Sequence, residues 1–159
     1  MGSRLEIPEA AYIAGFLDGD GSVMLQLKKR SDTKVGWRCM FTICFYQDSG
    51  HDKPRYWIRE KLGIGYISKR NDRMSELRIN GYKQVKEILL QLQPYVRFKH
   101  IQVSTMIEAA TVINENIRSC SVEDRKKLLD CILTVQQNNY RSSRRNSPEY
   151  LARILSLTL

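Results

Sequence analysis

Hydrophobic residues along the chain follow two different spacings, and the spacings alternate from one segment to the next. Residues 22–30 (SVMLQLKKR) and 37–47 (WRCMFTICFYQ) alternate apolar and polar side chains, as half-buried β-strands do. Two shorter alternating segments, 64–70 (IGYISKR) and 75–81 (SELRING), flank a turn at 71–74 (NDRM). The pattern therefore predicts two β-hairpins.

The other segments place apolar residues three and four positions apart, which predicts amphipathic helices. The first helix is expected from Pro8 to Asp18, because proline suits a first helical turn. Further helices are expected at about 53–63, 82–94, 100–115 and 121–136, and one begins after the N-cap Ser147. Hairpins and helices in the order αββαββα, followed by C-terminal helices, indicate an α+β fold with an antiparallel sheet. We expect one domain over 1–159, with a core at about 7–140 and a basic linker and terminal helix at about 141–159.

The first predicted helix carries small residues at positions where two backbones can come close together. Ala10, Ala11, Ala14 and Gly15 line one side of it, and Ala11 and Gly15 are four residues apart. Two interpretations stay open: close packing inside one subunit, or packing of this helix on a second copy of itself. In the second case Ala11, Ala14 and Gly15 form the dimer interface.

Composition adds a strong positive charge to this picture. The 159 residues include 26 Lys and Arg against 17 Asp and Glu, which gives a formal net charge of +9 and a pI near 9.5. Such an excess favours a polyanionic partner, with nucleic acid first and an anionic membrane surface second. The sequence has no run of eighteen apolar residues and no signal-peptide pattern, so we expect an intracellular protein that is neither secreted nor bound to a membrane.

The four cysteines point to a reducing compartment. Cys39, Cys44, Cys120 and Cys131 form no C-x-x-C pair, so neither a zinc site nor a disulfide framework is expected.

The positive charge gathers on one face of the predicted sheet. Gln, Asn and Arg side chains match base edges in the major groove of DNA, and a nine-residue strand spans about 30 Å, close to one duplex turn. The outward positions contain a single acid, Glu76, which favours double-stranded DNA as the partner over a merely solvated face. The predicted DNA-binding residues of the strands are Ser22, Met24, Gln26, Lys28, Arg30, Arg38, Met40, Thr42, Cys44, Tyr46, Tyr66, Ser68, Arg70, Glu76, Arg78 and Asn80.

Two carboxylates end the first helix, in the segment DGDGS at 18–22. A calcium loop of EF-hand type is excluded, because Val23 and Lys29 stand where that loop needs Gly and Glu. A plain helix stop or a turn explains Gly19 and Gly21 but not two acids at a helix C-terminus, where the macrodipole disfavours negative charge. A site for a hard cation such as Mg²⁺ explains both, because it takes carboxylate and carbonyl oxygens.

The nonapeptide IAGFLDGDG at 13–21 resembles the LAGLIDADG motif of homing endonucleases, with Ile13 and Gly19 as mild departures. The resemblance extends through Gln47, GIGYI at 63–67 and LQPYVRFKHIQ at 92–102, and it covers roughly residues 5–140. It implies the homing endonuclease fold, whose antiparallel sheet is saddle-shaped.

Because the motif occurs once, the resemblance implies a homodimer in which two such helices pack at the centre and bring their acidic ends together. The implied activity is hydrolysis of both strands of a long pseudo-palindromic DNA site, leaving short 3′ overhangs. The resemblance also implies intron homing from a group I intron of an organelle gene, in a chloroplast or mitochondrion.

The resemblance assigns roles to individual residues. Asp20 matches the metal-binding acid of the motif, and the carbonyl of Gly19 is the expected second ligand. Gln47 matches a position that holds the nucleophilic water, and Lys99 matches a basic residue near the scissile phosphate. Asp18 is expected to support the helix end. A further basic residue is expected just after Gln47, where His51 and Lys53 are the candidates.

The implied cofactor is Mg²⁺, with Mn²⁺ as an alternative and with Ca²⁺ supporting binding without cleavage. In the basic linker, Arg141, Arg144 and Arg145 are predicted to contact phosphates, which position a protein on DNA without specifying sequence.

Three alternative functions stay open at this point. An RNA maturase on the same fold would bind RNA and would not need Asp20. A catalytically inactive DNA-binding protein would not need Asp20, Gln47 or Lys99. A membrane-surface protein would need a basic amphipathic helix with bulky apolar residues, whereas the basic face predicted here lies on strands.

Overall fold

The computed structural model describes residues 4–115, 119–140 and 145–158. The predicted order of elements is confirmed. In chain order they are α1 (Ile7–Asp20), β1 (Gly21–Lys29), β2 (Trp37–Asp48), the short 3-10 helix η1 (Ser49–His51), α2 (Lys53–Leu62), β3 (Tyr66–Lys69), β4 (Met74–Asn80), α3 (Tyr82–Leu92), α4 (His100–Glu115), α5 (Val122–Asn138) and α6 (Pro148–Ile154).

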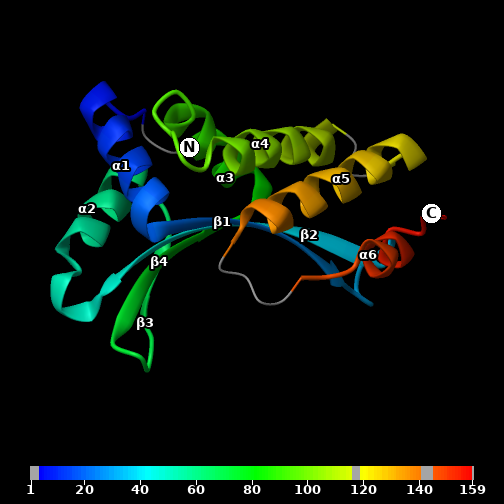
Figure 1. Ribbon diagram of the computed structural model, residues 1–159, viewed down its shortest axis with the longest axis horizontal. Coiled ribbons are helices and arrows are strands. Elements are labelled where there is room, and N and C mark those ends of the chain that lie inside the picture. The colour runs from blue at the N-terminus through cyan, green and yellow to red at the C-terminus, as the bar shows by residue number, and fades with distance from the viewer. Residues whose placement is uncertain (1–3, 116–118, 141–144, 159) are drawn as a thin grey trace.

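The four strands form one antiparallel sheet in the order β1-β2-β4-β3. Figure 1 shows α3, α4 and α5 on one side of a curved sheet, while the other side is uncovered. The fold is therefore α+β with helices on a single face of the sheet, as the hairpin pattern predicts.

The core lies between the helices and the inner face of the sheet. Odd-numbered strand residues such as Val23, Phe41, Ile43 and Leu77 are fully or almost fully buried, together with the apolar stripes of the helices. Alternate residues of a strand face opposite sides, so this burial leaves the even-numbered residues on the uncovered side. None of the helices in the described ranges is long and apolar enough to span a membrane.

Local signals in the sequence fix several helix ends. The Ser121 hydroxyl accepts a bond from the Asp124 amide at 3.0 Å and the Asp124 carboxylate accepts one from the Ser121 amide at 3.0 Å, which completes the capping box of α5. Ser147 caps α6 by accepting from the Tyr150 amide at 3.2 Å. Gly63 ends α2 in the left-handed region at φ +67°, where glycine is favoured.

The first helix differs from its prediction at the end that carries the acids. It continues through Asp20 instead of stopping at Asp18, and β1 begins at the next residue, Gly21. A Cβ at Gly21 would lie 2.7–2.8 Å from the side chain and backbone of Leu17, so only glycine allows the chain to pass directly from helix to strand. The helix therefore joins the strand without a connecting residue, and no separate turn is formed by the segment DGDG.

This close approach predicts that Gly21→Ala destabilises the protein by about 1–3 kcal/mol, because backbone atoms of Leu17 must move. Gly19→Ala is the matched control in the same turn, since a Cβ there meets no atom within 4 Å. In urea denaturation, the free energy of unfolding of Gly19→Ala should equal or exceed that of wild type. Equal losses for both variants would contradict the steric argument.

Candidate active site

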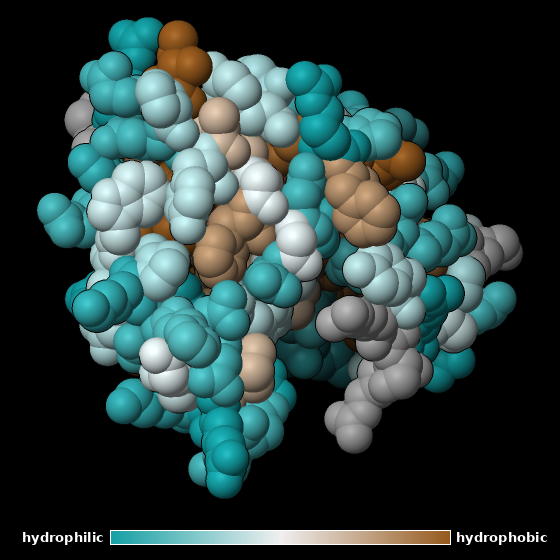
Figure 2. Space-filling model, turned by 60° about the vertical axis from the view of Figure 1, so that its left-hand side comes forward, coloured by the Kyte–Doolittle hydropathy of each residue, from teal (hydrophilic) through white to brown (hydrophobic). Residues whose placement is uncertain are grey.

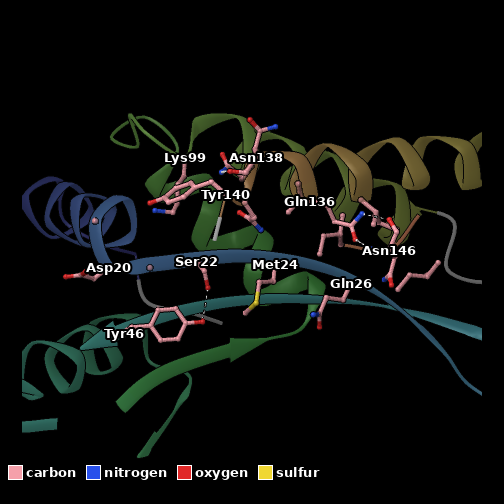
Figure 3. A pocket seen from close by; sticks show the side chains of 18 of the residues that line it. Asp20, Ser22, Met24, Gln26, Tyr46, Lys99, Gln136, Asn138, Tyr140 and Asn146 are labelled. Carbon is pink, nitrogen blue, oxygen red and sulfur yellow. Dashed lines mark hydrogen bonds between the residues drawn. The ribbon is translucent and has the colours of Figure 1, made fainter. Parts of the chain in front are cut away.

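A cavity of about 680 Å³ lies between β1 and the C-terminal end of α5. Figure 3 shows Asp20 at one end of it and Gln26 and Asn146 at the other, with Lys99 on the helical side. Two of the three residues predicted to be catalytic, Asp20 and Lys99, therefore line the same cavity, although 79 residues separate them in sequence.

Asp18 joins the end of α1 to the segment that precedes α4. Its carboxylate accepts hydrogen bonds from the amides of Arg97 (2.7 Å), Phe98 (3.1 Å) and Lys99 (2.9 Å). Partial burial acts to raise the pKa of Asp18, but these three amide donors outweigh it and lower the pKa overall. The predicted structural role of Asp18 is confirmed by these contacts.

Lys99 is held in place instead of being a solvated lysine. Its side chain is buried, with 6% of the residue exposed, and its Nζ donates to the carbonyl of Asp18 at 2.6 Å. The same Nζ lies 5.3 Å from the centre of the Phe98 ring. A cation anchored in this way adds fixed positive charge to the wall of the cavity.

Asp20 has the opposite environment to Asp18. The residue is exposed, and its carboxylate makes no hydrogen bond or ion pair with any residue in the described ranges. Gly19, which also lines the cavity, is exposed with open space where a side chain would stand. A carboxylate beside the peptide carbonyl of an exposed glycine provides the oxygen donors that a hard divalent cation takes.

Within the described part of the chain, no three His, Cys, Asp or Glu side chains gather into a metal-binding set. Any cation at Asp20 therefore needs further oxygen donors from water, a bound phosphate or a second subunit.

Gln47 lies near this cavity but does not line it. It stands at the end of β2, two residues beyond Phe45, the partner of Gly21 in the sheet. Its side-chain oxygen accepts a bond from the amide of its own neighbour Asp48 at 2.9 Å. The role of Gln47 in holding water stays a prediction.

The basic residue expected just after Gln47 stays a prediction at both candidate positions. His51 and Lys53 are both exposed. Arg55 is fully buried instead, and its Nη1 donates to the carbonyls of Gln47 and Ser75. Sequence reasoning missed Arg55, although it falls on the buried face of α2, three residues before Ile58.

The uncovered face of the sheet has the predicted composition. Even-numbered residues pair with even-numbered residues along all four strands, so the expected side chains share one face. Gln26, Lys28, Arg38, Tyr66 and Asn80 are exposed on or at the edge of it. Their contacts to DNA stay predictions.

Three residues of this face were wrongly expected to be exposed. Thr42, Cys44 and Glu76 are buried, because neighbouring side chains cover them. Thr42 donates to the Asn80 side chain at 2.8 Å, and Glu76 accepts from Nε of Arg78 at 3.0 Å. The single acid of the face is therefore both buried and neutralised.

Two arginines of the predicted set lie outside the strands. Arg30 follows β1 and binds Asp32 through two nitrogens at 2.7–2.8 Å, and Arg70 follows β3 and lies 3.1 Å from Asp72. Exposed pairs of this kind contribute at most about 1 kcal/mol, so phosphates can compete for both arginines.

Amide side chains hold the segment after α5 against β1. Gln136 and Asn146 exchange two hydrogen bonds, from Gln136 Nε2 to the Asn146 carbonyl (3.3 Å) and from the Asn146 amide to Gln136 Oε1 (3.1 Å). Asn139 donates to the carbonyl of Val23 at 2.9 Å. These bonds close the far side of the cavity, as Figure 3 shows for Gln136 and Asn146.

The basic residues of this segment are only partly described. Arg145 is exposed next to Asn146. Arg141 and Arg144 lie outside the described residues, so their predicted phosphate contacts stay predictions.

The stripe of small residues on α1 divides between two sides of the helix. Ala14 is fully buried inside the subunit, so its assignment to a dimer interface was wrong. Ala11 and Gly15 are exposed beside Ile7 and Tyr12, which are 69% and 50% exposed. Figure 2 shows apolar side chains gathered on the face over α1 and α2, with hydrophilic ones around them.

Comparison with known sequences identifies the family. A sequence model described as LAGLIDADG endonuclease matches residues 13–110, more than half of the chain. The chain belongs to the LAGLIDADG endonuclease family. The matched region begins at Ile13, the first residue of the nonapeptide, and includes Asp20, Gln47 and Lys99.

Two relatives in the LAGLIDADG endonuclease family are similar in sequence. DNA endonuclease I-CvuI of Chlorella vulgaris is 30% identical over 98 residues, and DNA endonuclease I-CreI of Chlamydomonas reinhardtii is 31% identical over 101 residues. The alignments cover 62% and 61% of this chain. They span only about three fifths of the relatives' own lengths, 61% of I-CvuI and 59% of I-CreI.

Solved structures confirm the predicted homing endonuclease fold. The homing endonuclease I-CvuI in complex with a DNA target matches with a TM-score of 0.78 at 24% identity, over 94% of this chain and 93% of that one. The archaeal intron-encoded homing endonuclease I-Vdi141I in complex with DNA matches with a TM-score of 0.79 at 18% identity, over 93% and 94%.

The three amide bonds of Asp18 predict a pH-dependent contribution to stability. Asp18→Asn is expected to lower the free energy of unfolding at pH 7 by about 1–3 kcal/mol, because an amide cannot accept all three bonds. The pKa of Asp18 is lowered in the folded protein, so this contribution is complete above the unfolded pKa of about 3.9 and is lost as the pH falls through the folded value.

Urea denaturation from pH 7 down to pH 3 measures this effect. The difference between wild type and Asp18→Asn should shrink below about pH 4. Asp20→Asn is the matched control, because that carboxylate has no protein partner in the described ranges, and its effect should stay within about 0.5 kcal/mol. A difference for Asp18→Asn that is constant with pH would contradict the assignment.

Proposed function

We propose that the chain is a site-specific, metal-dependent DNA endonuclease that acts as a homodimer. It hydrolyses both strands of a long pseudo-palindromic DNA site and leaves short 3′ overhangs. The observation that carries this proposal is the free carboxylate of Asp20, which lines one cavity with the anchored Lys99 at the edge of a basic, uncovered sheet. Membership of the LAGLIDADG endonuclease family supports the same activity.

The uncovered sheet face is the proposed surface for double-stranded DNA. Lys28, Arg38 and Gln26 are exposed on it, and its one acid is buried against Arg78. I-CvuI and I-Vdi141I, which share the fold, have been solved with DNA. Each chain has a net charge of +9, so a dimer has +18. Its affinity for DNA should therefore fall steeply as the salt concentration rises.

The donor atoms at the end of α1 fit Mg²⁺ or Mn²⁺. The Asp20 carboxylate and the Gly19 carbonyl would hold the ion, since both residues are exposed. A divalent metal bound there supplies an activated water and stabilises the attacking and leaving oxygens of the phosphodiester. The related I-CvuI has been solved with its own target in the presence of Ca²⁺, and with the I-CreI target, not cleaved, in the presence of Mg²⁺.

The chain's own side chains would then orient and stabilise the reacting groups. Lys99 is fixed by the Asp18 carbonyl, and its ammonium would offset negative charge that develops on the phosphate. Gln47 would orient the attacking water through its side-chain amide. The chain would need no covalent intermediate for this hydrolysis.

A second copy of the chain is the proposed partner of the exposed α1 face. Ala11 and Gly15 permit close approach of two backbones, and Ile7 and Tyr12 add apolar area beside them. Pairing of two α1 helices would bring two Asp20 carboxylates together and complete the ion site. The four free cysteines support action in a reducing interior, which we propose to be an organelle.

The first functional prediction compares wild type with Asp20→Asn on a library of randomised DNA duplexes. Wild type should bind a subset of duplexes with Ca²⁺ and cut them with Mg²⁺. Asp20→Asn should bind the same duplexes but cleave them far more slowly. The cleavage rate should fall by more than about 10–100-fold, the loss typical of residues that only support a metal ligand. Gel analysis of selected duplexes provides both readouts.

Two results would argue against the proposal. Cleavage by Asp20→Asn at the wild-type rate would exclude Asp20 as the metal ligand. Binding without cleavage by both proteins would favour an inactive DNA-binding protein or an RNA-directed role.

The second functional prediction concerns the α1 face. Gly15→Leu should raise the dimer dissociation constant by about tenfold or more, because a bulky side chain separates the two helices. The single chain has room where this side chain begins, since Gly15 is exposed and a Cβ there meets no atom within 4 Å. Gln137→Leu, exposed on α5, is the control for added hydrophobicity. Sedimentation equilibrium measures the dimer dissociation constant of each variant and of wild type. If Gly15→Leu and wild type have equal dissociation constants, this face is not part of the interface.

A further inference from the structure

Arg55 is a fully buried arginine that joins two strands of the sheet. It comes from α2, and 0% of the residue is exposed. Its Nη1 donates to the carbonyl of Ser75 and, at 3.2 Å, to the carbonyl of Gln47. Gln47 and Ser75 are direct partners in the pairing of β2 with β4. One guanidinium nitrogen therefore holds both strands at the point where β2 ends.

This burial is unfavourable for an arginine in energetic terms. Arg55 forms no ion pair in the described ranges, and its Nε and Nη2 are buried without a hydrogen-bond partner, as is the hydroxyl of Ser75. Burial lowers the pKa of Arg55, with the charges of Asp52 and Asp48 acting in the opposite direction. An apolar side chain of similar shape would avoid this desolvation, so stability alone does not account for the residue.

The surroundings of Gln47 show what the arginine fixes. The Gln47 side chain folds onto the Asp48 amide, and the Asp48 carboxylate accepts from the Gly50 amide at 2.7 Å. Both bonds are local to residues 47–50. Arg55 adds the bond that ties the Gln47 peptide to α2, and the backbone at Gln47 sets where its side chain points.

We propose that Arg55 is a positioning residue for DNA cleavage, which fixes the Gln47 peptide and thereby the amide that orients the attacking water. This inference rests on the proposed function and names the basic residue that acts beside Gln47. His51 and Lys53, the two candidates from sequence, are exposed at the end of η1 and the start of α2. Arg55 acts from α2, through a backbone carbonyl, and touches neither DNA nor metal.

A double-mutant cycle on the full chain tests the coupling. The proteins are wild type, Arg55→Met, Gln47→Ala and the double variant, with cleavage rate and duplex Kd measured on a duplex that wild type cuts. Arg55→Met should slow cleavage by about 10–100-fold, as misplaced catalytic groups do, with Kd changed by less than about twofold. In the Gln47→Ala background the same substitution should change the rate by less than about twofold, because Arg55 acts through Gln47.

Two further variants separate positioning from a general loss of structure. Arg55→Lys keeps a donor for the two carbonyls and should recover part of the rate. Arg59→Met removes an exposed arginine of the same helix that donates to the Gly65 carbonyl at 3.1 Å, away from Gln47, and should cleave at close to the wild-type rate.

The outcomes distinguish the inference from the proposed function. Additive losses in the cycle, a wild-type rate for Arg55→Met, or an equal loss for Arg59→Met would overturn the inference while cleavage by wild type stands. Absence of cleavage by wild type on every selected duplex would overturn the proposed function and this inference with it.

Discussion

The carboxylate of Asp18 is the interaction on which the geometry of the site depends. It binds three consecutive amides at residues 97–99, about eighty positions away in sequence, and the Asp18 carbonyl receives the ammonium of Lys99. These contacts tie the end of α1 to the start of α4, where the helix macrodipole favours a negative charge. Because α4 packs on α3 and α5, the same contacts set the position of the cavity wall relative to Asp20. The Asp20 carboxylate is therefore carried on a helix whose end is fixed two residues earlier, through both the carboxylate and the carbonyl of Asp18.

Two acids separated by one residue serve opposite purposes in this arrangement. Asp18 has its hydrogen-bonding capacity taken up by the protein, whereas Asp20 keeps its capacity for a ligand. A similar division holds for the cations. Lys99 and Arg55 are buried and bound to backbone carbonyls, while Lys28 and Arg38 are exposed on the sheet. The first pair of cations fixes the backbone, and the second pair is accessible to a partner.

The period of the hydrophobic pattern is sufficient to predict the order of the elements and the side of the sheet on which each residue lies. The pattern does not predict how deeply each side chain is buried. Thr42, Cys44 and Glu76 are on the predicted face but buried. Thr42 bonds Asn80 of the neighbouring strand, and Glu76 bonds Arg78 two residues along its own strand. Burial of Ala14 likewise depends on which helices pack against α1. Arg55 was not predicted because an arginine in an amphipathic helix is usually solvated, and only the fold brings it within hydrogen-bond distance of the Gln47 carbonyl.

The direct passage from α1 into β1 at Gly21 also limits how the chain can diverge. Strand side chains alternate with a period of two, so one inserted residue at this junction would turn Val23, Leu25 and Leu27 outward and bury Gln26 and Lys28. Changes in the side chains that β1 presents on the uncovered face must therefore arise by substitution and not by insertion at the helix–strand junction. The loop at residues 30–36, at the far end of the same hairpin, has no such restriction and can change in length while the register of β1 with β2 is kept.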